Sequence, residues 1–206
     1  DGLFARTKTV LTIHNAGYQG TVSTQALEEL GLAGDSHLLH QGDLARGRLS
    51  FLVAGILHAD ALTTVSRTYA REMMTEAYGM GLDGLLRARA GSFTGIVNGI
   101  DPRIWSPEAD PHIHARYSAA DLSGKAVCKR GLSLQAGFQD DPASPIVGIV
   151  SRMTAQKGFD LAFDVLPQAL RTTDMRLVVL GSGEARLVDF FLGLERRFPG
   201  RVRVRE

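Results

Sequence analysis

The 206-residue sequence contains a single cysteine, Cys128. One cysteine excludes an internal disulfide framework and a cysteine-rich zinc site, and we expect Cys128 to be a small packed residue of a protein from a reducing compartment. Apolar runs of about 20 residues, the length that crosses a bilayer, are absent as well. No signal peptide opens the sequence. We therefore expect a cytoplasmic protein without membrane contact.

Neither sign of charge is in excess, because 23 basic and 22 acidic side chains leave a formal net charge of +1. This balance gives no indication of a nucleic-acid groove or of an acidic membrane surface as partner, so any anion site must be local. His37 and His40 lack the accompanying carboxylate pattern of a zinc site. We expect no metal and no cofactor.

The sequence also lacks an initiator methionine, because it begins at Asp1. Its end, Glu206, directly follows a strand-like stretch, Val202–Val204, which is an unusual place to interrupt a sheet. We therefore expect a fragment of a longer protein. With 44% hydrophobic residues it can still bury the core of one large domain or of two small ones.

A strand, a polar loop and a helix are predicted around the stretch Pro145–Gly158. The largely β-branched run Ile146–Val150 predicts a strand buried on both faces of a parallel sheet. Apolar residues at helical spacing predict a helix over Gly158–Arg171 that starts at the loop. Arg152 and Lys157 flank the loop, and a helix N-terminus with two cations beside it suits a phosphate group. The alternative is that both are solvated surface cations.

A second strand, loop and helix follow in the sequence. Met175–Leu180 predicts a strand, Gly181–Glu184 a tight loop and Ala185–Phe198 a helix, ahead of the strand-like Val202–Val204. Together with the preceding stretch they give the order β-α-β-α-β. We therefore expect a parallel sheet with right-handed crossovers.

In the first half of the sequence, polar residues follow two predicted strands. The strand Val10–Ile13 runs into a Gly-rich loop that begins with His14 and Asn15, and the strand Phe93–Val97 ends at Asn98. Open parallel sheets bind ligands at the carboxyl ends of their strands, so these side chains are candidates to contact a substrate. For His14 the alternative is a turn in which the imidazole is hydrogen-bonded locally.

The other elements are predicted from periodicity, caps and turn residues. Helices are predicted over Ser23–Leu30, Leu49–Leu57, Arg67–Ala77 and Leu122–Phe138, and a strand over Ala61–Val65. Leu49–Leu57 is apolar almost all round, which is typical of a buried helix, and Ser66 can cap the helix that follows it. Gly31–Gly47 is expected to be mostly loop and Asp101–Ser118 a linker. In the last helix, the residues expected to point inward are Ala126, Val127, Leu132 and Leu134.

Six short motifs occur together in this sequence. They are Thr12-Ile13-His14-Asn15, Ala61-Leu62-Thr63-Thr64-Val65-Ser66, Tyr78-Gly79-Met80-Gly81-Leu82-Asp83-Gly84, Val97-Asn98-Gly99-Ile100-Asp101, Trp105-Ser106-Pro107, and Ser151-Arg152 with Gln156-Lys157-Gly158. Six coincident motifs are far more specific than any one of them, and they span nearly the whole sequence. With them the sequence resembles the bacterial glycogen synthases and the plant starch synthases.

The resemblance implies an α/β fold of the GT-B type, in which two Rossmann-like domains face a cleft. Residues 1–100 would then be the carboxyl-terminal part of the acceptor-side domain, 101–144 a linker and connecting helix, and 145–206 the start of the nucleotide-sugar-binding domain. The implied activity is transfer of glucose from ADP-glucose to the non-reducing end of an α-1,4-glucan, with retention at the anomeric carbon, in the glycogen biosynthesis of the bacterial cytoplasm. No metal is implied.

Functional residues of the family can be carried over to the matching positions. Arg152 and Lys157 match the pair that holds the diphosphate of the donor, His14 matches the histidine beside the donor glucose, and Asn98 matches the asparagine on the same sugar. The turn Gly181–Glu184 matches the Gly-rich turn beside the nucleotide. The further residues that we expect to contact the substrates are Asn15, Ser151, Gly181 and Gly183.

The sequence departs from the family at a few places. Ser182 and Glu184 stand where Ala or Thr and Asp are common. The amino-terminal Lys-x-Gly-Gly-Leu loop of the family would precede Asp1 and its cleft glutamate would follow Glu206, so we expect the fragment alone to be inactive. Two alternatives stay open: a catalytically dead glucan-binding fragment, and a GT-B transferase that uses a UDP-sugar on a lipid or small acceptor.

Overall fold

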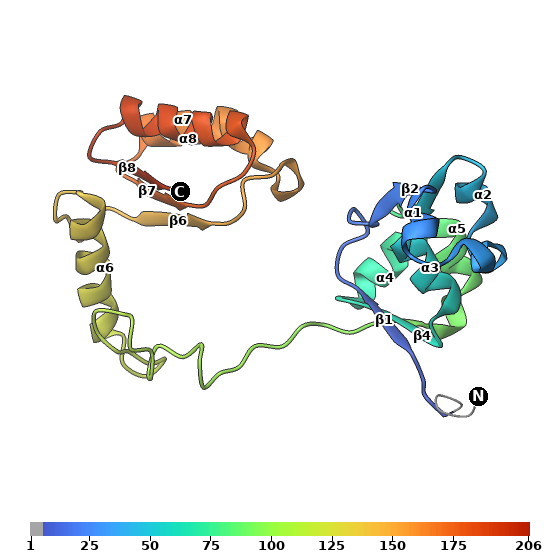
Figure 1. The fold of residues 1–206 in the computed structure, drawn as a ribbon. Helices are drawn as coiled ribbons and strands as arrows, with labels where there is room; N and C mark the ends of the chain where they lie inside the picture. The colour runs from blue at the N-terminus through green and yellow to red at the C-terminus, as the bar shows by residue number, and fades with distance from the viewer. Residues whose placement is uncertain (1–5) are drawn as a thin grey trace. The chain divides into compact units, whose positions relative to one another are not determined.

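The computed structural model describes residues 6–206 (Figure 1). We expect a fragment partly because the sequence begins at Asp1, and this residue lies outside the described residues. The chain divides into two compact units, the first ending at Ile100 and the second comprising Asp101–Glu206. Each unit contains a three-stranded parallel sheet, so the predicted α/β class with parallel sheets is confirmed.

The sheet of the first unit has the strand order β1-β4-β5. Its strands are β1 (Val10–Ile13), β4 (Ala61–Thr64) and β5 (Phe93–Gly95). Ile13 lies opposite Thr64 and Thr64 opposite Gly95, so the three strands end at the same level. The buried Thr64 hydroxyl donates a hydrogen bond of 2.7 Å to the Ile13 carbonyl, which ties β4 to β1 at this edge.

Three helices supply the rest of the core of the first unit. They are α3 (Phe51–His58), α4 (Arg67–Met73) and α5 (Asp83–Ala88), and a 3₁₀ turn η3 (Ala90–Ser92) leads into β5. The predicted cap of α4 is confirmed, because the Ser66 hydroxyl accepts the Tyr69 N–H at 2.8 Å. Side chains such as Ile56, Leu62 and Leu86 are fully buried. Burial of each stabilises the unit by about 2 kcal/mol.

The prediction that the helix at Leu49–Leu57 is buried on all sides is wrong. In α3, Val53 and Ile56 are buried, whereas Phe51 and Leu57 are 47% and 37% exposed. Leu49 lies instead in β3 (Arg48–Ser50), which pairs antiparallel with β2 (Thr21–Ser23). The helix begins after Ser50 because the hydroxyl of this residue accepts the Val53 N–H at 3.2 Å and caps it.

The prediction that Gly31–Gly47 is mostly loop is also wrong. The segment holds a 3₁₀ helix, η2 (Ala33–Leu38), and α2 (Gln41–Leu44). Before it lies α1 (Ala26–Glu29), inside the predicted helix Ser23–Leu30. These elements are only one or two turns long, so they carry too few apolar residues for a detectable period.

Asp43 is the buried polar residue that holds this segment to β3. Its carboxylate lies 3.0 Å from His40 Nδ1 and 3.0 Å from a guanidinium nitrogen of Arg48. Burial raises the pKa of the Asp43 carboxyl, but hydrogen bonds from His40 and Arg48 outweigh this effect and hold the pKa below its ordinary value. Polar contacts of this kind leave no signal in the apolar pattern of the sequence.

The second unit opens with the linker and the helix α6. Within the described stretch 101–122 the chain forms turns and bends but no helix or strand, and this stretch belongs to the second unit. The expectation that Asp101–Ser118 links two domains stays a prediction. Helix α6 (Ser123–Ala136) ends at Gly137, whose φ of 73° is the left-handed conformation of a typical C-cap.

The prediction of which residues of α6 point inward is wrong, because Ala126, Val127, Leu132 and Leu134 are all exposed. The buried residues of α6 are Gly124, Ser133 and Ala136, and the linker packs directly on the helix at two glycines. A Cβ on Gly124 would lie 2.1 Å from the Arg116 carbonyl oxygen, and one on Gly131 would lie 2.1 Å from the His114 ring. The half-buried Cys128 thiol donates to the Ala115 carbonyl at 3.1 Å on the same side.

The sheet of the second unit has the order β6-β7-β8 and is parallel throughout. Its strands are β6 (Ile146–Val150), β7 (Arg176–Leu180) and β8 (Val202–Arg205), and its helices are α7 (Ala162–Thr172) and α8 (Ala185–Arg197). The predicted order β-α-β-α-β is confirmed. Both helices lie on one face of the sheet (Figure 1), where Leu177, Val179 and Val202 are buried.

The prediction that β6 is buried on both faces is wrong. β6 is an edge strand, and Val147 and Val150 are 40% and 78% exposed. Val150 lies opposite Leu180, a residue of β7 that is 48% exposed. A β-branched run therefore predicted the strand correctly but not the burial of its second face.

The prediction that a helix starts at Gly158 is wrong as well. Two 3₁₀ turns precede α7, namely η4 (Ala155–Lys157) and η5 (Phe159–Leu161), and Gly158 lies between them with φ 70°. This left-handed residue interrupts the helical path, so α7 begins only at Ala162. Among residues 6–206, no helix combines the length and the apolar character needed to cross a bilayer.

Candidate functional site

Two loops meet at the carboxyl edge of the sheet in the second unit. Residues 151–158 follow β6 and residues 181–184 follow β7. Beyond the strand ends the ladder continues, with Ser151 N–H donating to Leu180 O at 3.1 Å and Met153 N–H to Ser182 O at 2.8 Å. Glu184 N–H returns a hydrogen bond of 2.8 Å to Met153 O. The two loops therefore run side by side, joined by backbone hydrogen bonds.

Gly181 and Gly183 make this close approach possible. A Cβ on Gly181 would lie 1.8 Å from the Ser151 carbonyl oxygen, and one on Gly183 would lie 2.2 Å from the Met153 carbonyl oxygen. No real Cβ contact is that short, so no larger residue fits at either position. The structure thus explains both glycines by backbone packing, while their expected contact with a substrate stays a prediction.

Arg152 and Lys157 lie on the first of the two loops, and both are exposed. The loop between them is anchored by Met153, which is fully buried and pairs with Gly183 in a parallel bridge. The structure therefore brings Ser151, Arg152, Gly181 and Gly183 together, with Lys157 at the end of η4 on the same loop. The two loops therefore carry two exposed cations at the carboxyl edge of the sheet.

The helix that begins beside these loops is α8 rather than α7. Helix α8 starts at Ala185, directly after the Gly-rich turn, whereas α7 starts five residues after Lys157. The first N–H groups of a helix have no partner within the helix and carry partial positive charge. An anion at the two loops would therefore meet the N-terminus of α8 in addition to the two cations.

His14 and Asn15 lie at the carboxyl end of β1 in the first unit. They line an open pocket of about 260 Å³ together with Thr12, Ile13, Tyr18 and Leu52. The Asn15 side-chain oxygen accepts the Gly17 N–H at 2.9 Å, which shapes the loop. The His14 ring is exposed, and it has no hydrogen bond or ion pair with any of the described residues. The alternative of a locally bonded imidazole is thus not what the structure contains.

Asn98 lies three residues beyond the end of β5, because this strand stops at Gly95 and not at Val97 as predicted. One further backbone hydrogen bond of 2.7 Å, from Ile96 N–H to Thr64 O, extends the ladder past the strand. From Ile96 to Ile100 every residue is exposed. Asn98 is therefore presented to solvent on the segment that leads out of the first unit.

The predicted site residues thus form two groups. His14, Asn15 and Asn98 belong to the first unit, and the residues of the two loops belong to the second. Each group is defined within its own unit. Within the described part of the chain, no cluster of three His, Cys, Asp or Glu side chains could hold a metal ion.

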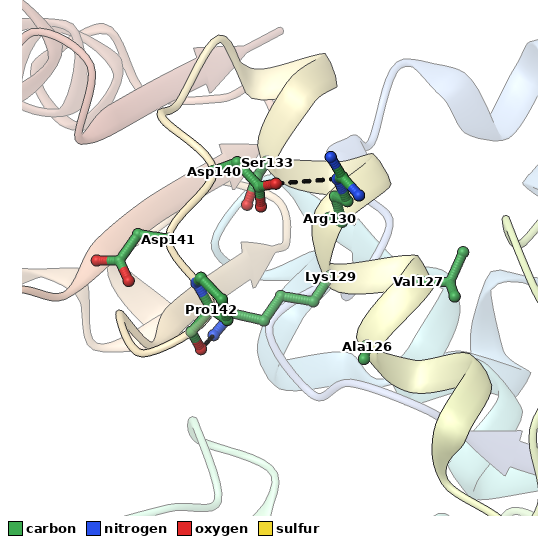
Figure 2. A pocket seen from close by; sticks show the side chains of 8 residues that line it. All are labelled: Ala126, Val127, Lys129, Arg130, Ser133, Asp140, Asp141 and Pro142. Carbon is green, nitrogen blue, oxygen red and sulfur yellow. Dashed lines mark hydrogen bonds and ion pairs between the residues drawn. The ribbon is translucent and has the colours of Figure 1, made fainter.

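Several pockets lie away from the predicted residues, and two of them show how charged side chains are held. One, of about 370 Å³, lies between α6 and residues 140–142 (Figure 2). Arg130 Nε is 2.9 Å from the Asp140 carboxylate, and the Lys129 ammonium donates to the Pro142 carbonyl. These contacts hold α6 to the segment that leads into β6, so we assign the pocket a structural role.

The second pocket, of about 420 Å³, contains the buried Asp43 in the first unit. Sequence reasoning did not predict this pocket.

Sequence reasoning also did not predict the contact of Glu184 with the loop after β6, where its carboxylate Oε1 accepts the Ala155 N–H at 2.8 Å. The only sequence signal for Glu184 was its place after a Gly-x-Gly turn at the start of a helix.

A family model described as the starch synthase catalytic domain matches residues 1–88. A glycogen synthase from Myxococcus xanthus is 48% identical over 203 residues, which cover 98% of this chain and 42% of the relative. A glycogen synthase from an Anaeromyxobacter species is 45% identical over 205 residues, with 100% and 43% covered.

Among solved structures, the catalytic domain of starch synthase IV from Arabidopsis thaliana bound to ADP and acarbose is similar to this chain. The TM-score is 0.87 at 33% sequence identity, and the match covers 96% of this chain and 41% of that one. The chain therefore spans less than half of the length of the relatives that it matches.

Proposed function

The chain belongs to the glycogen and starch synthase family, and from this premise we propose that the full-length protein transfers glucose from ADP-glucose to the non-reducing end of an α-1,4-glucan. The transfer retains the configuration of the anomeric carbon and serves glycogen synthesis in the bacterial cytoplasm. The Arabidopsis relative, whose structure holds ADP and acarbose, supports both ligand classes, the nucleotide sugar and the glucan.

For the full-length protein we propose the GT-B arrangement, in which two Rossmann-like domains face a cleft. Residues 1–100 would belong to the acceptor-side domain, residues 101–144 to the linker and connecting helix, and residues 145–206 to the nucleotide-sugar-binding domain. The parallel sheet in each unit and the fold similarity to a starch synthase support this arrangement.

The observation that carries the proposal is the pair of loops at the carboxyl edge of β6 and β7. They combine two exposed cations, glycines that let the two loops approach each other closely, and the N-terminus of α8. The cations and the helix N-terminus carry positive charge. Each of these features favours an anion, and a diphosphate is the anion that a nucleotide-sugar donor supplies. Ligands of open parallel sheets bind at this edge.

Arg152 and Lys157 would act on the leaving group. When the bond between glucose C1 and the diphosphate oxygen breaks, negative charge grows on the diphosphate toward the transition state. Fixed cations aimed at that charge lower the barrier more than they aid ground-state binding. Arg152 offers a planar fork for two phosphate oxygens, whereas Lys157 offers a point charge.

The other residues would hold the substrates. His14, with its exposed ring, and Asn98 would contact the donor glucose, and Asn15 would line the sugar pocket beside His14. Ser151, Gly181 and Gly183 would contact the nucleotide through the backbone of the two loops. No metal or other cofactor has a role in this proposal.

The test is steady-state transfer of labelled glucose from ADP-glucose to glycogen by the full-length protein. We expect Lys157→Ala and Arg152→Ala each to lower kcat about a hundredfold, with a smaller change in the donor KM, because each removes one preorganised charge. Arg171→Ala removes an exposed cation at the end of α7 and serves as the control. Values of kcat within about threefold of wild type for both variants would exclude these residues from the mechanism.

The same assay separates the alternatives. A UDP-sugar transferase would prefer UDP-glucose over ADP-glucose as donor. A catalytically dead glucan-binding protein would bind glycogen and transfer nothing from either donor.

A further inference from the structure

Glu184 stands at the cap position of α8 but does not cap that helix. Its side chain makes no capping hydrogen bond to the α8 backbone. The carboxylate turns instead to the neighbouring loop, where Oε1 accepts the Ala155 N–H at 2.8 Å across 29 positions of sequence. Ala155 is the first residue of η4, the turn that ends with Lys157.

The turn η4 has no cap of its own. Thr154 occupies its cap position, and this side chain accepts no capping hydrogen bond. Within the turn, Lys157 N–H bonds to Thr154 O and Gly158 N–H to Ala155 O, both at 3.0 Å. Without Glu184 the Ala155 N–H would be an unbonded donor at the start of the turn. Glu184 supplies the acceptor that a cap residue normally provides.

Glu184 also extends the connection between the two loops. The backbone ladder between them runs through Met153, which accepts the Glu184 N–H at 2.8 Å. The carboxylate of the same residue then reaches two residues further along the first loop, to Ala155. Glu184 thus connects the loop that contains the Lys157 turn to the loop after β7 through both its backbone and its side chain.

We propose that Glu184 is a positioning residue that caps the Lys157 turn from the neighbouring loop and thereby sets where the Lys157 ammonium meets the donor diphosphate. This inference rests on the function proposed above. The hydrogen-bond acceptor is what matters in this role and not the negative charge, because a carboxylate close to a diphosphate repels it. The two properties can be separated, since glutamine keeps the acceptor oxygen and loses the charge.

The variants Glu184→Ala, Glu184→Asp and Glu184→Gln of the full-length protein test the role. We expect Glu184→Ala to lower kcat about tenfold, because small misplacements of a catalytic group cost up to about a hundredfold. Glu184→Asp should resemble it, since the side chain is one methylene shorter. Glu184→Gln should stay within about threefold of wild type. Asp189→Ala is the control. The Asp189 carboxylate on α8 is exposed and has no hydrogen-bond partner among the described residues, so this variant should leave kcat unchanged.

Hydrogen exchange of the Ala155 amide gives a readout without substrate. In the ligand-free protein the amide should lose protection in Glu184→Ala and Glu184→Asp and keep it in Glu184→Gln and Asp189→Ala. A protected Ala155 amide in Glu184→Ala, or loss of activity in Glu184→Gln equal to that in Glu184→Ala, would overturn the inference.

The double variant Lys157→Ala/Glu184→Ala separates this inference from the proposed function. If Glu184 acts through Lys157, the double variant should be no slower than Lys157→Ala alone. If the two losses multiply instead, Glu184 acts by another route, and the inference fails while the role of Lys157 stands. If Lys157→Ala itself keeps wild-type kcat, the proposed role of Lys157 fails, and the inference fails with it.

Discussion

Replacing Gly181 by alanine should destabilise the second unit by about 3 kcal/mol. The new Cβ would lie 1.8 Å from the Ser151 carbonyl oxygen, and real Cβ contacts are essentially never shorter than 3.0 Å. The two loops must therefore separate by at least 1.2 Å, the difference between these two distances. Because the neighbouring atom is backbone, no flexible side chain can absorb the shift.

The hydrogen bonds on both sides of Gly181 set the size of the effect. Ser151 N–H donates to Leu180 O at 3.1 Å, and Gly181 N–H donates to Arg205 O at 3.0 Å. A shift of more than 1 Å breaks or weakens both, at a net cost of about 1 kcal/mol each. Overpacking adds about 1–3 kcal/mol. Together these contributions amount to about 3–5 kcal/mol, so the expected loss of about 3 kcal/mol is the lower end of this range.

Gly148→Ala in β6 is the matched control, because nothing lies within 4 Å of a Cβ at that position. Alanine there should leave stability unchanged or raise it by about 0.5–1 kcal/mol, since it restricts the unfolded chain. The assay is urea unfolding of the full-length variants followed by circular dichroism. ADP binding by calorimetry should weaken in Gly181→Ala alone. Equal urea midpoints for the two variants would refute the close contact between the loops.

Two further predictions concern the rest of the chain. Hydrogen bonds from the N–H of Thr9 and the ammonium of Lys8 lower the pKa of Asp60 to about 2 from an ordinary 3.8. The Asp60 carboxylate therefore stabilises the first unit above about pH 4, and this contribution is lost as the pH falls toward 2. Wild type and Asp60→Asn should therefore differ in urea midpoint at pH 7 and converge near pH 2, and a difference that persists at pH 2 would contradict the pairing. In α6, Gly124→Ala directs a Cβ to 2.1 Å from the Arg116 carbonyl oxygen and should lower stability by about 2–3 kcal/mol. Gly193→Ala in α8 is the control: the nearest atom lies 3.9 Å from the new Cβ, and the variant should raise stability by about 1 kcal/mol. The same melting temperature for both variants would contradict the packing of the linker on α6.

Much of the fold could be predicted because its strands carry their own signal. The runs that became β6 and β7 are short and largely apolar, and β8 alternates valine with arginine. Stretches with helical spacing separate them, so their order and parallel sense followed from the sequence. The strand ends in turn predicted which loops would hold the polar site residues. Ser151, Arg152, Gly181 and Gly183 do lie together on two such loops.

Several of the errors share one physical origin, which is that glycine and polar contacts carry no apolar signal. On α6, Gly124 and Gly131 lie where the linker packs, because the linker needs the space that a side chain would fill. Gly158 adopts φ 70° and so delays α7, and a sequence does not reveal the φ of a glycine. The reach of Glu184 to Ala155 joins residues 29 positions apart, which no local pattern can anticipate.

The parallel pairing of β1 with β4 has a consequence for biosynthesis. Val10 pairs with Ala61, 51 positions later in the sequence, whereas pairs in the second unit such as Ile146 with Arg176 and Leu177 with Val202 lie 30 and 25 positions apart. At about 5–20 residues per second, a ribosome needs about 3–10 s to add 51 residues and about 1–6 s for the shorter spans. Among the described residues β1 has no strand partner other than β4. Among the strand pairs that the structure describes, β1 and β4 are therefore the two strands whose syntheses lie furthest apart in time, so their pairing has the longest delay before it can form.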